Sequence, residues 1–205
     1  MIRGYYFITG GSLSLKGNLS DVRAAVRAGV SVIQYRNKDS DSYVMYKECL
    51  SIRKIVKNAF LLINDRIDIA FAVNADGVHI GNQDLPYESA RRLLGRKKII
   101  GMTVHNLKEA HKAQRFGADY LGVSPIFSTA TKSDAGLPCG PGLIKEIKRK
   151  INLPVVAIGG ITLENADSVI TAGADAVCAI SSVVTKENVT GEIRKFQNKF
   201  RYDEN

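Results

Sequence analysis

Cysteine is scarce in this sequence, and long hydrophobic runs are missing from it. The three cysteines, Cys49, Cys139 and Cys178, are widely separated among 205 residues, a spacing that favours neither a disulfide framework nor a zinc site. No apolar run approaches the roughly 20 residues of a membrane-spanning helix. The first residues enter strand-like sequence without the charged start, apolar stretch and cleavage site of a signal peptide. We therefore expect a cytoplasmic protein without membrane association.

Acidic residues are few relative to basic ones. The 20 Asp and Glu residues against 29 Lys and Arg give a formal net charge of +9, an excess that attracts nucleic acid, acidic membranes or phosphorylated small molecules. The basic residues lie mostly on helical stretches such as 91–98 and 145–150, without the interleaved aromatics of a single-strand stacking platform. The charge therefore favours small phosphorylated ligands over nucleic acid, with a solvated Lys-rich surface as the alternative.

One local pattern recurs along the chain. A segment with helical spacing ends at Gly or Asn, and a short β-branched run follows, as in Ala28-Gly29-Val30 and Ala172-Gly173-Ala174. A glycine just past a helix adopts the left-handed conformation that ends it, and a short run that is apolar on both faces is typical of a buried parallel strand. Eight such runs are present, at 5–9, 30–36, 60–64, 77–80, 99–104, 120–124, 154–158 and 176–180.

Helical patterns separate these runs, for example over 106–115 and over 162–172, where Thr162 and Asn165 form a partial capping pattern. Strict alternation of eight strands with helices predicts the α/β class and a closed (β/α)8 TIM barrel, with residues 1–205 as a single domain. An open doubly wound sheet is the alternative, but the turn after the first strand lacks a Gly-rich dinucleotide fingerprint.

The polar residues directly after each run are candidate site residues, because active sites of such barrels lie at the C-terminal strand ends. Gly159 and Gly160 follow the seventh run, and Ser181 and Ser182 follow the eighth. Glycines let an anion approach backbone N–H groups, serines add donors, and a helix N-terminus favours negative charge. This pairing predicts a phosphate site, whereas two glycines alone are also typical of a tight turn.

Cationic side chains follow the second run. At the strand period of two, Gln34, Arg36 and Lys38 point to one side, and two cations with an amide suit a highly charged anion such as diphosphate. Lys132, in a loop rich in hydroxyls and small residues, is placed to close over the same anion. The alternative is that Arg36 and Lys38 are ordinary surface charges at the start of a loop.

Two carboxylates follow neighbouring strands, Asp65 after the third run and Asp84 after the fourth. Beside the cationic residues they predict a Mg2+ ion between protein and diphosphate, since Mg2+ commonly takes one or two carboxylates together with phosphate oxygens and water. The alternatives are a helix cap for Asp65 and a loop turn for Asp84.

The histidines and cysteines offer little further chemistry. His79 lies inside an apolar run and is interpreted as a core or near-core residue, while His111 lies on a solvated helix. His105 ends the fifth run and suits either a general base or a helix cap. No pair of residues resembles a nucleophile with its activating base, so covalent catalysis by the protein has no visible agent.

Five segments together resemble the thiamine-phosphate synthase family, in order and over nearly the whole chain. They are 34–38 (Gln-Tyr-Arg-Asn-Lys), 63–66 (Ile-Asn-Asp-Arg), 75–84, 122–132 and 156–162. The resemblance implies a (β/α)8 barrel and a transferase of thiamine biosynthesis. Such an enzyme joins a hydroxymethylpyrimidine diphosphate to a thiazole phosphate, releases diphosphate and needs Mg2+.

The resemblance also implies particular site residues. The pyrimidine diphosphate would contact Gln34, Tyr35, Arg36, Asn37, Lys38, Asn64, Thr103 and Lys132. The thiazole phosphate would contact Thr129, Ala130, Thr131, Gly160, Ile180 and Ser181, and Asp65 and Asp84 would hold Mg2+. The predicted catalytic residues among them are Arg36, Thr103 and Lys132. The chemistry it implies is dissociative: diphosphate leaves, and the thiazole nitrogen captures the pyrimidine-methyl cation, so the protein stabilises the leaving group and positions the substrates.

Two other functions stay open. Thiazole tautomerase is a relative on the same barrel with a histidine where His105 stands, but it has no diphosphate or Mg2+ to hold, so Gln34, Arg36, Lys38 and Asp65 favour the synthase. A non-catalytic regulator that binds a phosphorylated ligand is the second, motivated by the net charge of +9. A homo-oligomer is compatible with each of these functions.

Overall fold

The computed structural model describes residues 2–131 and 136–200 of the chain. Its strands are β1 (Gly4–Ile8), β2 (Val32–Tyr35), β3 (Phe60–Asn64), β4 (Gly77–Ile80), β5 (Ile99–Val104), β6 (Tyr120–Val123), β7 (Val155–Ile158) and β8 (Ala176–Cys178). Its helices are the 3-10 helix η1 (Gly11–Leu13) and the α-helices α1 (Asn18–Ala28), α2 (Ser42–Ile55), α3 (Ile67–Ala72), α4 (Tyr87–Leu94), α5 (Leu107–Phe116), α6 (Gly140–Lys150), α7 (Ala166–Thr171), α8 (Ile180–Val184) and α9 (Val189–Lys199).

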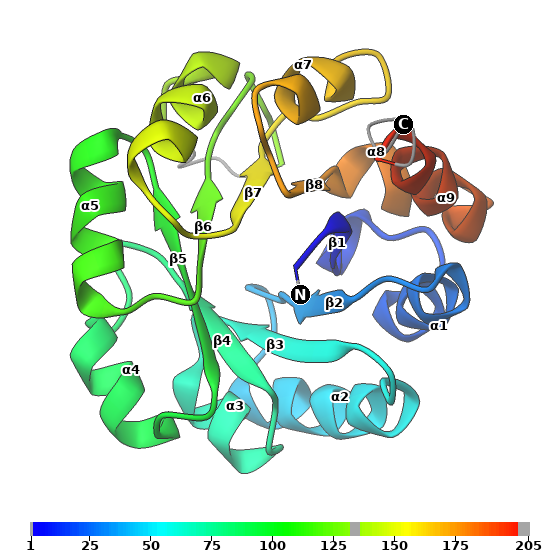
Figure 1. Ribbon diagram of the computed structural model, residues 1–205. Coiled ribbons are helices and arrows are strands. Elements are labelled where there is room, and N and C mark those ends of the chain that lie inside the picture. Colours follow the sequence, from blue (N-terminus) through cyan, green and yellow to red (C-terminus); the bar gives the residue numbers. More distant parts are fainter. Residues whose placement is uncertain (1, 132–135, 201–205) are drawn as a thin grey trace.

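The strands pair in parallel in chain order, and β8 pairs with β1, so the sheet closes into an eight-stranded barrel. Figure 1 shows the helices as an outer ring around these strands. The predicted α/β class and (β/α)8 barrel are confirmed. None of the described helices is long and apolar enough to cross a membrane.

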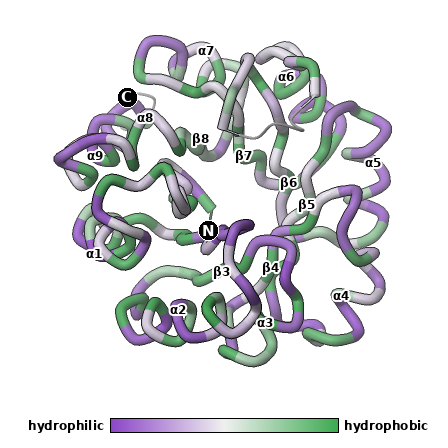
Figure 2. Tube along the Cα trace, turned by 180° about the vertical axis from the view of Figure 1, so that it is seen from behind, coloured by the Kyte–Doolittle hydropathy of each residue, from purple (hydrophilic) through white to green (hydrophobic). Residues whose placement is uncertain are grey.

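Alternate side chains of each strand enter two different apolar layers. Tyr6 and Ile8 of β1 lie inside the barrel, whereas Tyr5 and Phe7 pack in the layer between the strands and the helices. The period of two in a strand produces this division. Figure 2 shows mainly hydrophobic strands and helices that carry both hydrophilic and hydrophobic stretches, as expected when one side of each helix covers the barrel.

Three aspartates clamp neighbouring strands at the N-terminal end of the barrel. Each directly precedes a strand, and its carboxylate accepts a hydrogen bond at 2.7 Å from a backbone N–H at the start of the strand before it: Asp76 from Leu61, Asp119 from Ile100 and Asp175 from Val155. The same carboxylates pair with Arg53 of α2, Arg91 of α4 and Lys148 of α6 at 2.7–2.9 Å. The recurring Ala-Asp of the sequence is therefore a structural device that ties β3 to β4, β5 to β6 and β7 to β8.

Two of the predicted boundaries that differ from the structure lie near the candidate phosphate site. The eighth strand ends at Cys178, and Ile180 already begins α8. The helix predicted from Thr162 begins at Ala166, because Asn165 accepts a hydrogen bond from the Thr162 N–H at 2.8 Å and donates one to the Gly160 carbonyl at 2.9 Å. The Asn165 side chain therefore stabilises a turn before the helix.

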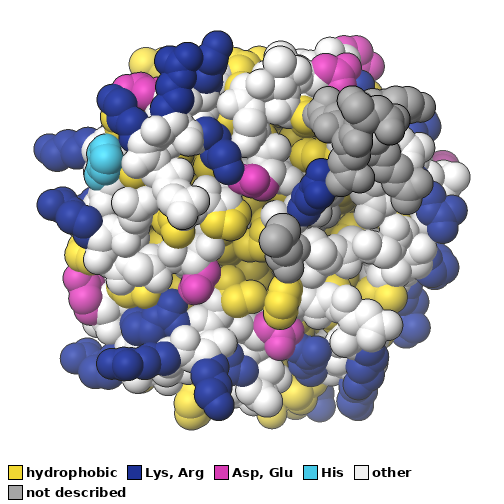
Figure 3. All heavy atoms as spheres, viewed as in Figure 1, with side chains coloured by type: hydrophobic (Ala, Val, Ile, Leu, Met, Phe, Trp, Pro, Cys, Tyr) yellow, Lys and Arg dark blue, Asp and Glu magenta, His cyan; other side chains and the backbone are white. Residues whose placement is uncertain are grey.

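The positive charge does not form one patch on the face drawn in Figure 3. Lys and Arg side chains are spread around the rim of that face, and hydrophobic side chains are visible in the hollow at its centre. A dispersed charge of this kind solvates the surface and gives no extended track for a nucleic-acid backbone on that face.

Candidate active site

A cavity of about 320 Å³ lies at the C-terminal ends of the strands. All eight strands or the loops that follow them contribute to its wall. The lining residues are Ile8, Gln34, Arg36, Lys38, Asn64, Asp65, His79, Gly81, Asn82, Gln83, Asp84, Thr103, His105, Ser124, Thr129, Thr131, Ile158, Gly159, Gly160, Ile161, Cys178, Ala179, Ile180 and Ser181.

The structure brings most of the predicted site residues together in this wall. Those that line it are Gln34, Arg36, Lys38, Asn64, Asp65, Asp84, Thr103, Thr129, Thr131, Gly160, Ile180 and Ser181. Tyr35, Asn37 and Ala130 are absent from the lining. The predicted Lys132 lies outside the described residues.

Tyr35 and Asn37 occupy the strand positions that alternate with Gln34, Arg36 and Lys38. The Tyr35 ring is buried in the layer between strands and helices, and its hydroxyl donates to Glu48 Oε2 at 2.6 Å. The Asn37 side chain donates to Ser40 Oγ at 3.0 Å within its own loop. Both side chains therefore stabilise the surroundings of the strand rather than the cavity wall.

Arg36 and Lys38 bring positive charge to the side of the cavity formed by β2, β3 and β4. The guanidinium of Arg36 has no hydrogen bond or ion pair with any described residue, whereas Lys38 Nζ lies 3.3 Å from Asp65 Oδ2. Asp65 itself adopts a left-handed conformation with φ of 62°, which Asp tolerates better than most residues. Its side chain does not cap α3, where the capping position belongs to Arg66.

Asp84 lies near Asp65, and its side chain is held by a hydrogen bond within its own loop after β4. Its Oδ2 accepts a hydrogen bond from the Gly81 N–H at 2.7 Å, so the residue also serves the turn. Burial and then the nearby Asp65 carboxylate raise the pKa of Asp84 to about 6 from its ordinary 3.8, against the lowering effect of the Gly81 hydrogen bond and Lys38. A cation placed between these two carboxylates would relieve their repulsion.

The donor set at Asp65 and Asp84 fits Mg2+ and does not fit a closed protein metal site. Among the residues that the structure describes, no group of three or more His, Cys, Asp or Glu could hold a metal. Two carboxylates are the usual protein share of a Mg2+ site whose other ligands are phosphate oxygens and water. The amide side chains of Asn64, Asn82 and Gln83 line the same wall and add further oxygen donors.

The packing of two loops requires a glycine at position 160, whatever ligand binds there. The φ of Gly160 is 62°, and a Cβ atom there would lie 2.4 Å from the Ser128 carbonyl oxygen and 2.8 Å from Phe127 Cβ. The loop after β7 therefore packs directly on the loop after β6. This contact explains the glycine without reference to phosphate, which the sequence alone could not show.

The two serines after β8 have different environments. Ser181 lines the cavity, whereas Ser182 Oγ donates to the Ile161 carbonyl at 3.0 Å. Of the two serines predicted to supply donors to the site, Ser181 lines the cavity and Ser182 does not. Thr129 and Thr131 line the wall from the loop after β6, and Thr129 Oγ1 accepts a hydrogen bond from the Thr131 N–H at 3.2 Å.

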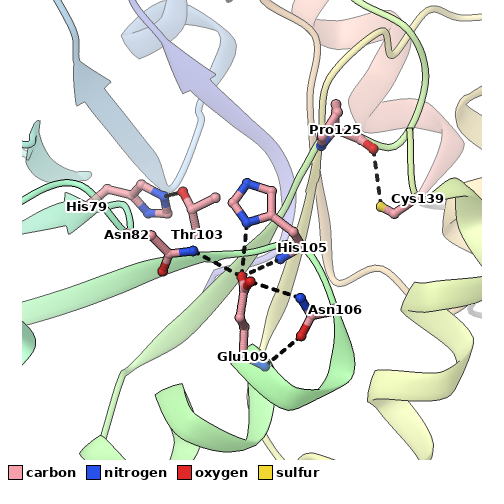
Figure 4. A network of polar contacts seen from close by, with 8 residues as sticks. All are labelled: His79, Asn82, Thr103, His105, Asn106, Glu109, Pro125 and Cys139. Atoms are coloured by element: carbon pink, nitrogen blue, oxygen red, sulfur yellow. Dashed lines mark hydrogen bonds and ion pairs between the residues drawn. The ribbon is translucent and has the colours of Figure 1, made fainter. Parts of the chain in front are cut away.

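His105 reaches the cavity wall beside Glu109 of α5 (Figure 4). Its Nδ1 lies 2.9 Å from Glu109 Oε2, which also accepts from the His105 backbone N–H at 2.9 Å and from Asn82 Nδ2 at 3.2 Å. The hydrogen bonds from His105 and Asn82 lower the pKa of Glu109 against the opposing effect of burial. Glu109 thereby holds the His105 ring at the cavity wall. The helix cap belongs to Asn106 instead, whose Oδ1 accepts from the Glu109 N–H.

Sequence reasoning missed His79 as a wall residue and gave no role to Asn82 and Gln83. His79 is 5% exposed, as a near-core interpretation requires, yet it lines the cavity and its Nε2 lies 2.8 Å from Thr103 Oγ1. The available signal was its inward position on β4, in register with Asn64 of β3. Asn82 and Gln83 stand between Gly81 and Asp84 at a strand end, where barrel sites are built.

Comparison with known proteins shows what the chain is similar to. The family described as thiamine monophosphate synthase matches residues 5–183 of the chain. The thiamine-phosphate synthase of Methanosarcina barkeri is 52% identical over 198 residues, which cover 96% of this chain and 90% of that protein. The thiamine-phosphate synthase of Chloroflexus aurantiacus is 44% identical, with 94% and 90% covered. The structure of thiamine phosphate pyrophosphorylase from Pyrococcus furiosus superposes with a TM-score of 0.90 at 34% identity, covering 98% of this chain and 97% of that one.

Proposed function

Because the chain belongs to the thiamine monophosphate synthase family, we propose that its cavity joins a hydroxymethylpyrimidine diphosphate to a thiazole phosphate, giving thiamine phosphate and diphosphate. The chain is a thiamine-phosphate synthase by its similarity over most of its length. The details of substrate placement, catalytic residues and metal are our proposals, and each is supported by the residues that line the cavity.

The observation that supports this function best is the separation of two anion-binding sides in one cavity. Arg36, Lys38, Asp65 and Asp84 follow β2, β3 and β4, whereas Gly160 and Ser181 follow β7 and β8. In a closed barrel of eight strands, β3 lies opposite β7. The cationic side suits the diphosphate, and the side with backbone N–H groups and hydroxyls suits the single phosphate of the thiazole.

The reaction requires the C–O bond to the diphosphate to break and a bond from the methylene carbon to the thiazole nitrogen to form. The electron pair of the broken bond leaves with the diphosphate, and the nitrogen supplies the new pair, so no protein nucleophile is needed. Arg36 stabilises the charge that grows on the leaving group, because its guanidinium is not already neutralised by a described residue. Lys38 adds to it, and we propose the same role for Lys132.

Thr103 and Asn64 line the cavity, and we propose that they position the pyrimidine ring and its diphosphate. Thr129, Thr131, Gly160, Ile180 and Ser181 surround the thiazole phosphate in the same proposal. Asp65 and Asp84 would hold Mg2+, which supplies positive charge to the diphosphate oxygens when bound. The cavity lining gives no support for the substrate contacts that the family resemblance implies for Tyr35, Asn37 and Ala130.

Incubation of the protein with both substrates and Mg2+, followed by mass analysis, tests this function. We expect thiamine phosphate and diphosphate in equal amounts, and neither when the thiazole phosphate is omitted. Isomerisation of the thiazole without condensation would show a tautomerase, the alternative that the His105–Glu109 pair favours most. Ligand binding with no reaction would show a non-catalytic regulator.

A further inference from the structure

A chain of hydrogen bonds crosses the inside of the barrel beneath the cavity. Gln34 Nε2 donates to the Tyr6 hydroxyl at 2.8 Å, and the Tyr6 and Tyr120 hydroxyls are 2.7 Å apart. Tyr120 Oη lies 2.8 Å from His79 Nδ1, and His79 Nε2 lies 2.8 Å from Thr103 Oγ1. The last of these contacts is drawn in Figure 4. Five side chains from β2, β1, β6, β4 and β5 are thereby connected in a row.

The direction of this row of hydrogen bonds can be read from its Gln34 end. The amide nitrogen of Gln34 can only donate, so the Tyr6 oxygen accepts there and its own proton goes to Tyr120. Burial raises the pKa of both tyrosines, so each hydroxyl keeps its proton at neutral pH. Tyr120 then donates to His79 Nδ1, which leaves the His79 proton on Nε2 and directs it to Thr103.

Both ends of this row of hydrogen-bonded side chains, Gln34 and Thr103, line the cavity. Gln34 is 1% exposed and lines the cavity, yet its Oε1 is buried without a hydrogen-bond partner among the described residues. A buried acceptor left unpaired is costly, so a ligand donor that reached this oxygen would remove that cost. At the other end, Thr103 Oγ1 accepts from His79 and keeps its own O–H for the cavity.

We propose that Tyr6, Tyr120 and His79 are positioning residues that hold Gln34 with its oxygen toward the pyrimidine, and so select a ring with an exocyclic amino group over the oxo analogue. The inference rests on the proposed function, since that function supplies an aminopyrimidine. If the Gln34 amide turned over, its NH2 group would face the ring and would favour an oxo group instead. The three buried residues contact Gln34 or one another and act through it.

Two measurements test the inference. In the ¹⁵N-labelled wild-type protein, long-range ¹H–¹⁵N correlation spectra should show His79 as the neutral Nε2–H form. Calorimetry should show that the wild type binds the 4-amino pyrimidine diphosphate more tightly than its 4-oxo analogue by roughly 10- to 100-fold. Tyr6→Phe removes the acceptor that orients Gln34, so we expect this preference to fall to within about 3-fold. The affinity for inorganic diphosphate should stay at the wild-type value.

Tyr87→Phe is the matched control. Tyr87 is also a buried tyrosine, but its hydroxyl donates to the Gly117 carbonyl at 2.7 Å, outside the barrel, so the wild-type preference should persist. An Nδ1–H form of His79, or full preference in Tyr6→Phe, would overturn the inference. The His79 spectrum decides the direction of the chain even where Tyr6→Phe does not fold. Absence of thiamine phosphate from the wild-type reaction would instead refute the proposed function.

Discussion

Asp84→Asn should make the metal-free protein more stable at neutral pH and the enzyme much less active. The pKa of Asp84 is raised to about 6 from 3.8, which corresponds to roughly 3 kcal/mol at 1.36 kcal/mol per unit. Because Asp84 is only partly buried, solvent screening reduces this to about 1 kcal/mol. Asparagine keeps an oxygen for the Gly81 N–H and carries no charge.

The pH dependence follows from the direction of the shift. A carboxyl with a raised pKa in the folded state contributes stability that is present below pH 3.8 and is lost as the pH rises through about 6. The stability gain of Asp84→Asn over the wild type should therefore be near zero at pH 3.5 and about 1 kcal/mol at pH 7.5. Denaturant unfolding in the presence of a chelator measures it. Turnover with Mg2+ should fall by about 100-fold, the scale on which an electrostatic stabiliser acts.

Asp68→Asn is the control with the opposite sign. The Arg66 side chain hydrogen-bonds Asp68 and lowers the pKa of its carboxyl, so this variant should lose stability at pH 7.5, regain it at acid pH and keep its turnover. A turn role for Asp84 without a metal predicts lower stability and nearly normal turnover for Asp84→Asn. That pair of results would refute the assignment of Asp84 to the metal.

Three further outcomes follow from the described contacts. Arg36→Gln should weaken the binding of inorganic diphosphate by roughly 10- to 100-fold in calorimetry, with little change in melting temperature, because Arg36 has no partner to lose among the described residues; an unchanged affinity would remove Arg36 from the anion site. Gly160→Ala should lower the melting temperature and weaken the binding of both substrates, because the new Cβ meets the Ser128 carbonyl and displaces the loop. Weaker binding of the thiazole phosphate alone, with a normal melting temperature, would contradict this. Asp119→Ala leaves the Ile100 N–H without its acceptor and removes the ion pair of Arg91, which should cost about 1–3 kcal/mol in denaturant unfolding, with turnover at 25 °C preserved; a loss of turnover in the folded variant would show that this end of the barrel is not independent of the site.

The fold was predictable because its evidence is local. The runs at 60–64, 77–80 and 99–104 coincide with β3, β4 and β5, since an apolar run between turn residues is a buried strand in this class. Strand eight was predicted too long because Ala179 and Ile180 are as apolar as the strand itself, and only the geometry of the barrel rim turns them into a helix. The start of α7 was missed because Asn165 bonds backward to Thr162 and Gly160.

The candidate site was predictable where a side chain's direction follows from strand period. Gln34, Arg36 and Lys38 were expected on one side, and they line the cavity. The same period places Tyr35 and Asn37 elsewhere, and the family resemblance overrode it. The row from Gln34 to Thr103 was not predictable, because Tyr6 and Tyr120 read as core aromatics until the stagger of the closed barrel brings them together.

The aspartate clamps stabilise some strand pairs of the barrel and leave others without a carboxylate bridge. Three strand pairs carry a carboxylate bridge, while the pair β1–β2 has Ser31 at the corresponding position, with an Oγ bond of 3.4 Å to the Arg3 carbonyl. Cooperative opening of such a barrel proceeds by contiguous segments, and the weakest seam opens first. Amide hydrogen exchange at the N-terminal ends of the strands should therefore be faster at the unclamped pair β1–β2 than at the three clamped pairs. If the pyrimidine contacts Gln34 of β2 as we propose, its binding would slow exchange at β1–β2 more than across the clamped pairs.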